Sequence, residues 1–173
     1  MARWKRTLFG SGGSEIAEAA LVLPIAFMVL LAIYWFGRAF NIYGTINRAA
    51  QEGVRVGVAQ TCGSCGNAPP LSTAIANQVV NALQASHLNA SQVIPISPVY
   101  LGCAGGSVAC STSSNIYICT NVQLVAAPPG SSGPPACGVS LDFEYPYQMT
   151  LPFTSISNRV FKLSAHVQMR SEQ

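Results

Sequence analysis

The sequence is short of charge. Only 9% of its 173 residues are Asp, Glu, Lys or Arg, whereas soluble domains usually carry about 25%. The deficit is uneven, because nine of the fifteen charges lie in residues 1–55, six lie in 142–172 and none lies in 56–141. A formal net charge of +3, spread in this way, does not supply the clustered basic face that nucleic-acid binding requires. Nucleic acid is therefore excluded as a partner.

Sequence signatures of catalysis and metal binding are missing as well. The chain has no G-x-S-x-G, P-loop, dinucleotide-binding or H-E-x-x-H pattern. His87 and His166 have no ligand-type neighbours, so both are interpreted as solvated. Asp142 and Glu144 share one face of a predicted strand and could bind a cation, although surface carboxylates at this spacing are common. We therefore expect no enzyme activity, no cofactor and no metal site.

A long apolar run is present near the N-terminus. Residues 19–37 contain no charge, and a helix of this length spans roughly 28 Å, close to the ~30 Å hydrocarbon core of a bilayer. The run ends in three aromatic residues, Tyr34–Phe36, followed by Arg38, as in the aromatic belt of a membrane helix. One transmembrane helix is predicted. The alternative, a cleaved signal peptide, would have a shorter apolar core followed by small residues.

The helical pattern continues beyond the apolar run. Apolar and small residues recur at intervals of three and four from Ile42 to Gly57, while Arg55 and other charged residues fall on the opposite face. Small residues such as Ala49 and Gly53 keep one stripe of this helix thin. A sheet or another helix could therefore approach it closely.

Two motifs flank the apolar run. The sequence from Gly13 to Pro24 is GSEIAEAALVLP, and the sequence from Ala49 to Arg55 is AAQEGVR. The first resembles the processing site of type IV prepilins, where a glycine and four further residues precede a glutamate and a long apolar helix. Together they resemble the TadE/TadG-like family of pilus-assembly proteins, in which an E-x-A-L-V-L-P helix is followed by an A-A-x-E-G-x-R segment. The resemblance covers about residues 10–58.

This resemblance implies a processing event and an assembly contact. A prepilin peptidase would cut after Gly13, so that Ser14 becomes a new N-terminus and Glu18 the fifth residue. In pilin-like filaments this glutamate pairs with the amino group of a neighbouring subunit. A carboxylate in the first helical turn is also favoured by the helix dipole. Pro24 removes one backbone hydrogen bond and is expected to kink the helix, a defect that membrane helices tolerate.

The register of processing has an alternative. Gly10 and Glu15 have the same spacing, which would give Ser11 as the mature start. We favour the register of Gly13 because Glu18 directly precedes the apolar run. An uncleaved, glycine-rich juxtamembrane linker is a further possibility.

The cysteines indicate the compartment. All six follow the apolar run, and an even set in a small, loop-rich region is typical of a disulfide framework in an oxidising compartment. The part after the span is therefore predicted to lie outside the cytoplasm, while the fifteen possible connectivities stay open. A redox pair in the C-x-x-C motif is less favoured, because the βαβ context of thioredoxin-type motifs is missing. The disulfide candidates are Cys62, Cys65, Cys103, Cys110, Cys119 and Cys137.

The residues after the long helix are predicted to form one small domain. Helical spacing covers 71–88, with Ser72 or Thr73 available as a cap. Strands are predicted over 92–100, 115–125, 139–147 and 161–169, the third of them half-buried by strict alternation. The expected fold is α+β and pilin-like: a long N-terminal transmembrane and amphipathic helix packs on a small, disulfide-stabilised antiparallel sheet. The expected segments are a cytoplasmic leader (1–13), the transmembrane and amphipathic helix (14–58) and an extracytoplasmic domain (59–173).

The function implied is that of a minor pilin or pseudopilin of a Tad (Flp)-type pilus. Its expected partners are other pilus subunits, the pilus assembly platform, a prepilin peptidase and the lipid bilayer, with Ala49, Gly53 and Arg55 on the assembly helix. The expected location is the bacterial inner membrane, as a single-pass protein, and the pilus or cell surface after assembly. The alternatives are an uncleaved, single-pass extracytoplasmic binding domain associated with a secretion system or surface, and, less favoured, a secreted thiol-active enzyme.

Overall fold

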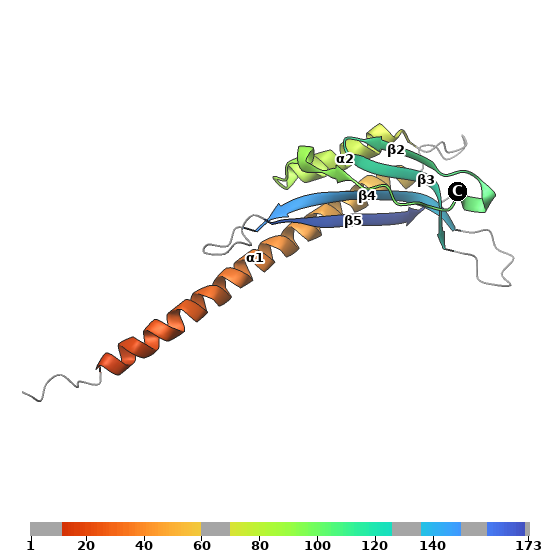
Figure 1. The fold of residues 1–173 in the computed structure, drawn as a ribbon. Helices are drawn as coiled ribbons and strands as arrows, with labels where there is room; N and C mark the ends of the chain where they lie inside the picture. The colour runs from red at the N-terminus through yellow and green to blue at the C-terminus, as the bar shows by residue number, and fades with distance from the viewer. Residues whose placement is uncertain (1–11, 60–69, 126–135, 150–158, 172–173) are drawn as a thin grey trace, which may run out of the picture. The chain divides into compact units, whose positions relative to one another are not determined.

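The computed structural model describes residues 12–59, 70–125, 136–149 and 159–171. The chain forms two compact units, residues 1–39 and residues 40–173. A single α-helix, α1 (Gly12–Val58), begins in the first unit and ends in the second, as the orange ribbon in Figure 1 shows. The helix runs through Pro24, so the proline is accommodated within helical backbone.

The second unit contains a five-stranded antiparallel sheet. Its central strand, β4, pairs with β5 along one side and with β3 along the other, and β2 extends the sheet beyond β3. The short β1 pairs with β4 next to the stretch that β3 covers. The elements after α1 are α2 (Ser72–Ala85), η1 (Ala90–Gln92), β1 (Ile94–Pro95), η2 (Cys103–Gly105), β2 (Ala109–Ser113), β3 (Ile116–Val125), β4 (Ala136–Gln148) and β5 (Val160–Arg170).

The core of this unit lies between the C-terminal part of α1, helix α2 and one face of the sheet. Gly53 marks the closest approach of α1 to the other two layers, because a Cβ placed there would lie 2.3 Å from Cγ2 of Val79 in α2 and 3.2 Å from Cδ1 of Leu141 in β4. Gly57 lies in the same way against Ile75 and Val139. The thin stripe of small residues thus allows α1 to contact both layers at once.

The α+β fold expected from the sequence is confirmed, with a long apolar helix, an antiparallel sheet and disulfides. Helix α2 and strands β3, β4 and β5 lie close to the predicted segments. The cap prediction for α2 is wrong, because its N-cap is Leu71 and no side chain caps it.

The predicted strand over 92–100 is also wrong. Only Ile94–Pro95 is strand, and η1 occupies the positions before it. Pro95 and Pro98 explain the short strand, because proline has no N–H to donate to a β-ladder. The residues from 96 to 101 lie outside named strands, and the chain then meets β3 at a single bridge between Gly102 and Val122.

Candidate functional site

The first candidate site is the N-terminal part of α1. Most of its large apolar side chains from Ile16 to Phe36 are exposed, although Trp35 is only 9% exposed, and no part of its most apolar window is buried. Within the part of the chain that the structure describes, α1 is long and apolar enough to cross a membrane, judged by length and composition. Arg38 lies over the ring of Trp35 at 5.9 Å from the ring centre, so a cation and an aromatic ring lie together where the apolar run ends.

The predicted processing residues lie at the beginning of this helix. Gly13 and Ser14 are part of the helical backbone of α1, and the side chains of Glu15 and Glu18 are exposed. Gly10 and Ser11, the alternative cleavage position, lie outside the described residues.

The three predicted assembly residues separate into two groups. Ala49 is 2% exposed, and Gly53 lies at the contact with α2 and β4, so both face the core of their own domain. Arg55 is exposed. Of these residues, Arg55 alone presents its side chain to a possible neighbour.

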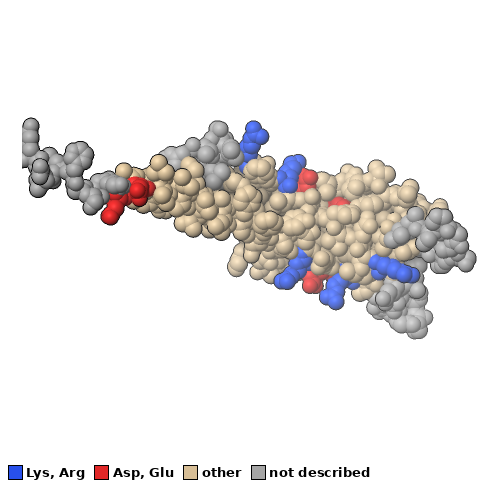
Figure 2. All heavy atoms as spheres, turned by 90° about the horizontal axis from the view of Figure 1, so that it is seen from below, with Lys and Arg blue, Asp and Glu red and all other residues tan. Residues whose placement is uncertain are grey.

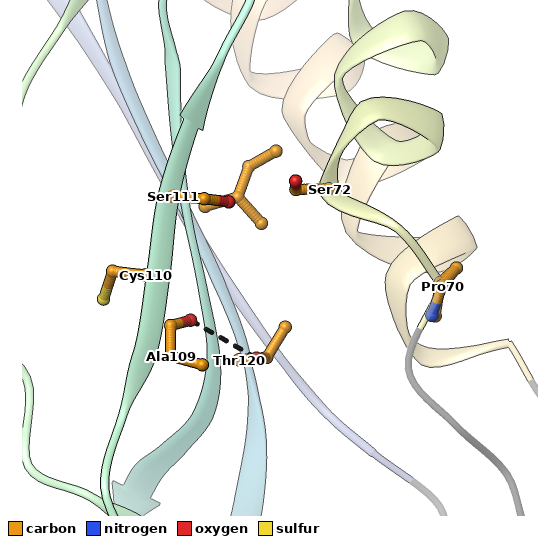
Figure 3. Close-up of a pocket in the computed structure, with 7 residues that line it drawn as sticks. Pro70, Ser72, Ala109, Cys110, Ser111 and Thr120 are labelled. Carbon is orange, nitrogen blue, oxygen red and sulfur yellow. Dashed lines mark hydrogen bonds between the residues drawn. The ribbon is translucent and has the colours of Figure 1, made fainter.

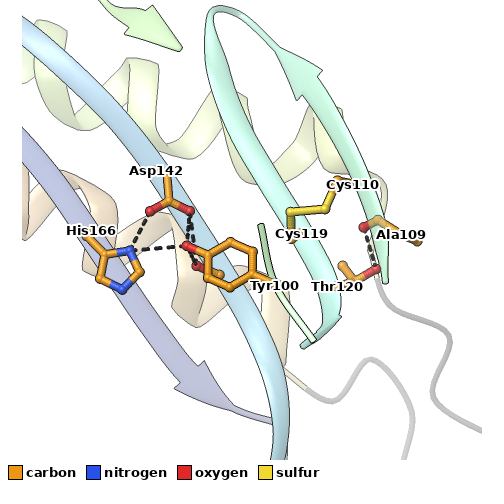
Figure 4. The surroundings of a disulfide bond; sticks show 8 residues. Tyr100, Ala109, Cys110, Cys119, Thr120, Asp142 and His166 are labelled. Carbon is orange, nitrogen blue, oxygen red and sulfur yellow. Dashed lines mark hydrogen bonds and ion pairs between the residues drawn. A yellow bond between two sulfur atoms is a disulfide. The ribbon is translucent and has the colours of Figure 1, made fainter. Parts of the chain in front are cut away.

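Four of the candidate cysteines form two disulfides. Cys103 bonds to Cys137, with 5.5 Å between their Cα atoms, and thereby ties η2 to β4. Cys110 bonds to Cys119 across the β2–β3 pair, where the two are direct partners in register (Figure 4). Cys62 and Cys65 lie outside the described residues.

A buried polar cluster lies on the sheet face that carries alternate residues of β4. Asp142 is 1% exposed, although the sequence pattern predicted a surface carboxylate. The hydroxyl of Tyr100 donates to its Oδ2 at 2.6 Å, and Nδ1 of His166 bonds to its Oδ1. Ser140, which is fully buried, donates to Tyr100 Oη at 2.8 Å. Figure 4 shows these side chains converging from β4, β5 and the segment before η2.

The cluster holds a covering segment in place. Burial, followed by the hydrogen bond to Asp142, raises the pKa of Tyr100 to about 12, so its hydroxyl stays a donor at physiological pH. Ser140 bonds to Tyr100 and Asp142, and a fully buried hydroxyl cannot meet a substrate. The arrangement therefore attaches the segment of residues 96–101 to the sheet.

The two histidines and the second carboxylate have different surroundings. His166 is exposed, as the prediction of a solvated side chain expected, and it also bonds to Asp142, a partner that the sequence did not indicate. His87 is exposed, in left-handed backbone with φ of 58°. Glu144 pairs with Lys162 at 3.2 Å. Among the described residues, no three His, Cys, Asp or Glu side chains are placed to hold a metal ion.

A shallow hollow of about 180 Å³ lies between the start of α2 and the β2–β3 pair. Pro70 and Ser72 form one wall, and Ala109, Ser111 and Thr120 contribute to the other (Figure 3). The hydroxyl of Thr120 donates to the carbonyl oxygen of Ala109 at 3.3 Å. The volume is below the 300–1,000 Å³ usual for small-molecule sites, and the lining carries no charged side chain.

Comparison with known proteins finds a sequence similarity in the N-terminal helix. The family model described as TadE-like protein matches residues 13–55, which include the predicted processing residues and both flanking motifs. No curated protein and no solved structure matches the chain. The resemblance inferred from the sequence is therefore confirmed, and residues 13–55 are a TadE-like segment.

Proposed function

We propose that this chain is a membrane-anchored minor pilin or pseudopilin of a Tad-type pilus. The TadE-like match to residues 13–55 carries the proposal. In this proposal α1 anchors the chain in the inner membrane, and the second unit lies outside the cytoplasm. The chain acts by packing against other pilus subunits and the assembly platform, and not by catalysis.

The surface of α1 supports the anchoring step. Most apolar side chains from Leu21 to Phe36 point outward, with Trp35 as the buried exception, on a helix whose most apolar window has no buried part. Such a surface is stable only in lipid or against other apolar helices. A lipid bilayer before assembly and a helical bundle after assembly would each cover it.

The disulfides support the orientation. Disulfides persist in the bacterial periplasm and other oxidising compartments and are rare in the cytoplasm. Both pairs that the structure describes lie in the second unit, after the apolar helix. This favours a single-pass topology with the N-terminus in the cytoplasm.

The processing step makes Glu18 the central assembly residue. After cleavage at Gly13, the new amino group of Ser14 carries a positive charge that a carboxylate of a neighbouring subunit can neutralise. A carboxylate within an apolar bundle is costly unless it is paired. Glu18 would supply that partner, four residues after the new N-terminus.

Two glutamates on one exposed helix give a matched test of the register. We expect Glu18→Ala to reduce incorporation into pili while membrane insertion persists, and Glu15→Ala to leave incorporation nearly unchanged. N-terminal sequencing of the protein from its native host should show a start at Ser14. A start at Ser11, together with a defect for Glu15→Ala, would move the register. An intact Met1 with normal incorporation of both variants would refute processing and charge pairing together.

An uncleaved single-pass binding domain is the second candidate, and one observation favours it. Gly12 and Gly13 already belong to α1, so a peptidase would have to unwind the first helical turn to reach the bond after Gly13. Because helix ends fray readily, this cost is small. The N-terminal sequence of the native protein separates the two candidates.

A further inference from the structure

Four of the seven large apolar side chains exposed in the described part of the second unit lie towards one end of it. They are Phe40 and Tyr43 on α1 and Val160 and Phe161 at the beginning of β5, with exposures of 71%, 48%, 49% and 42%. We call these four residues the aromatic end. The other large apolar side chains exposed in the described part of this unit are Leu71, Val99 and Leu101.

Because α1 packs on β4, the residues of the aromatic end on α1 and those on β5 lie at the same height along the sheet. Gly53 lies against Leu141 and Gly57 against Val139, so the helix and the strand run in opposite directions. From Gly53 back to Phe40 the helix covers about 20 Å, at 1.5 Å per residue. The same length of strand takes about six residues at 3.3 Å each.

Counting six residues along β4 from Leu141 leads to Tyr147, which pairs with Phe161. Phe161 also lies on the α1 side of the sheet, because paired residues share a face and Tyr147 shares that of Leu141. In Figure 1 this end of the β4–β5 pair likewise lies beside α1 and away from η2.

The place of the aromatic end along α1 indicates which surroundings can cover its exposed side chains. The uncharged run ends at Gly37, three residues before Phe40, so the aromatic end begins where α1 leaves the apolar segment. Two exposed basic residues, Arg159 and Lys162, flank Val160 and Phe161; Lys162 pairs with Glu144, so Arg159 supplies the charge for a headgroup. Aromatic rings beside basic side chains are typical of the membrane interface, where the cations meet anionic headgroups.

We propose that the aromatic end is a second membrane contact, which docks onto the headgroup region of an anionic bilayer. Phe161 enters the interface from β5 while Phe40 enters it from α1, so the domain is held against the membrane at two points. The proposal rests on the anchoring of α1 proposed above. It adds a restraint on how the domain is held before the subunit is incorporated into a pilus.

Fluorescence quenching in vesicles tests the contact. The full chain with Trp4→Phe and Trp35→Phe carries no native tryptophan, and Phe27→Trp, at a position 59% exposed in the apolar run, serves as the internal reporter. Added to this background, Phe161→Trp reports on the aromatic end. Leu101→Trp is the matched control, because Leu101 is exposed (74%) and bonds to Gln123, whose partner Cys137 lies near the opposite end of β4. Each protein is reconstituted in phosphatidylcholine with phosphatidylglycerol, with or without brominated acyl chains.

We expect brominated lipid to quench the emission of the tryptophan at position 27 and the emission added by Phe161→Trp, but not that added by Leu101→Trp. Omitting phosphatidylglycerol, or adding Arg159→Gln, should reduce the quenching at position 161. Quenching at position 27 without quenching at position 161 would refute the second contact and leave the anchor intact. Equal quenching at positions 101 and 161 would show unspecific adsorption and refute it too. Absence of quenching at position 27 would refute the anchor itself and the contact that rests on it.

Discussion

The close packing of α1 against α2 and β4 makes a quantitative prediction about Gly53. Replacing Gly53 with Ala places a methyl group 2.3 Å from Cγ2 of Val79 and 3.2 Å from Cδ1 of Leu141. Both partners are fully buried, and a valine side chain has little rotamer freedom with which to move away. Overpacking of this kind usually costs about 1–3 kcal/mol of unfolding free energy.

The same substitution also raises helix propensity, by about 1 kcal/mol in a helix interior. Gly44→Ala isolates this contribution, because Gly44 lies in the same helix, is exposed, and has no atom within 4 Å of a placed Cβ. We expect Gly44→Ala to stabilise the domain by up to about 1 kcal/mol. The difference between the two variants should therefore equal the cost of the clash, about 1–3 kcal/mol.

Thermal unfolding of the full chain in detergent micelles measures this difference. Near-ultraviolet circular dichroism follows the fixed packing of aromatic rings, which is lost when the domain unfolds even if helical backbone persists in the micelle. A difference of 1 kcal/mol corresponds to roughly 2–4 °C in Tm for a chain of this size. If Gly53→Ala raised Tm as much as Gly44→Ala does, α1 could not be packed against α2 and β4 at this position.

Three further predictions concern the polar cluster and the disulfides. Asp142→Asn should lower the unfolding free energy by about 1–3 kcal/mol, because a buried hydrogen-bond network loses its charge. Glu144→Gln should lower it by less than about 1 kcal/mol, because the ion pair of Glu144 is more exposed. Equal losses of unfolding free energy in urea titrations would contradict the burial of Asp142. Tyr100 should ionise near pH 12. Since its pKa is above the unfolded value of 10.0, its contribution to stability should be complete below about pH 10 and lost as the pH rises towards 12. Tyr100→Phe should remove this phase from an absorbance titration. Peptide mapping without reduction should recover Cys103 with Cys137 and Cys110 with Cys119. Removing the first disulfide should lower the unfolding free energy by about 4 kcal/mol and removing the second by about 3 kcal/mol, because the closed loops differ in length. An exchanged pairing in the peptide map would refute the sheet register.

Local sequence patterns were sufficient to predict the long helix and the strands that carry the core. The helical spacing from Ile42 to Gly57 indicated the buried stripe, where Ile46 and Ala50 are fully buried, although Tyr43 is exposed. Alternation likewise indicated β4 and β5, whose pairing runs unbroken from Gly138 to Gln148. Both signals are repeated over many residues, so tertiary contacts reinforce what the periodicity favours.

The polar cluster could not be predicted in this way. Asp142 and Tyr100 are 42 residues apart, and no local pattern indicates that residues 96–101 cover the face of β4 on which Asp142 lies. Strand β2 was missed for a related reason. Its turn to β3 places Ser114 and Asn115 at positive φ, 49° and 62°, without the Asn-Gly or Asp-Gly pair that usually reveals a tight hairpin.

The fold also changes the explanation of the missing charge. Residues 56–141 supply α2, β2 and β3, which belong to the second unit, so burial in a membrane does not account for the deficit there. The exposed part of β2 consists of Ala109–Thr112, which carries no charge. In Figure 2, which views the molecule from below, charged side chains are few on the face that is drawn. An edge strand of a free-standing domain is usually protected by charge, often lysine, because its unpaired backbone groups invite other chains. An edge without such protection creates little electrostatic repulsion against a neighbour. A subunit that packs beside others is the class of protein for which this surface is expected.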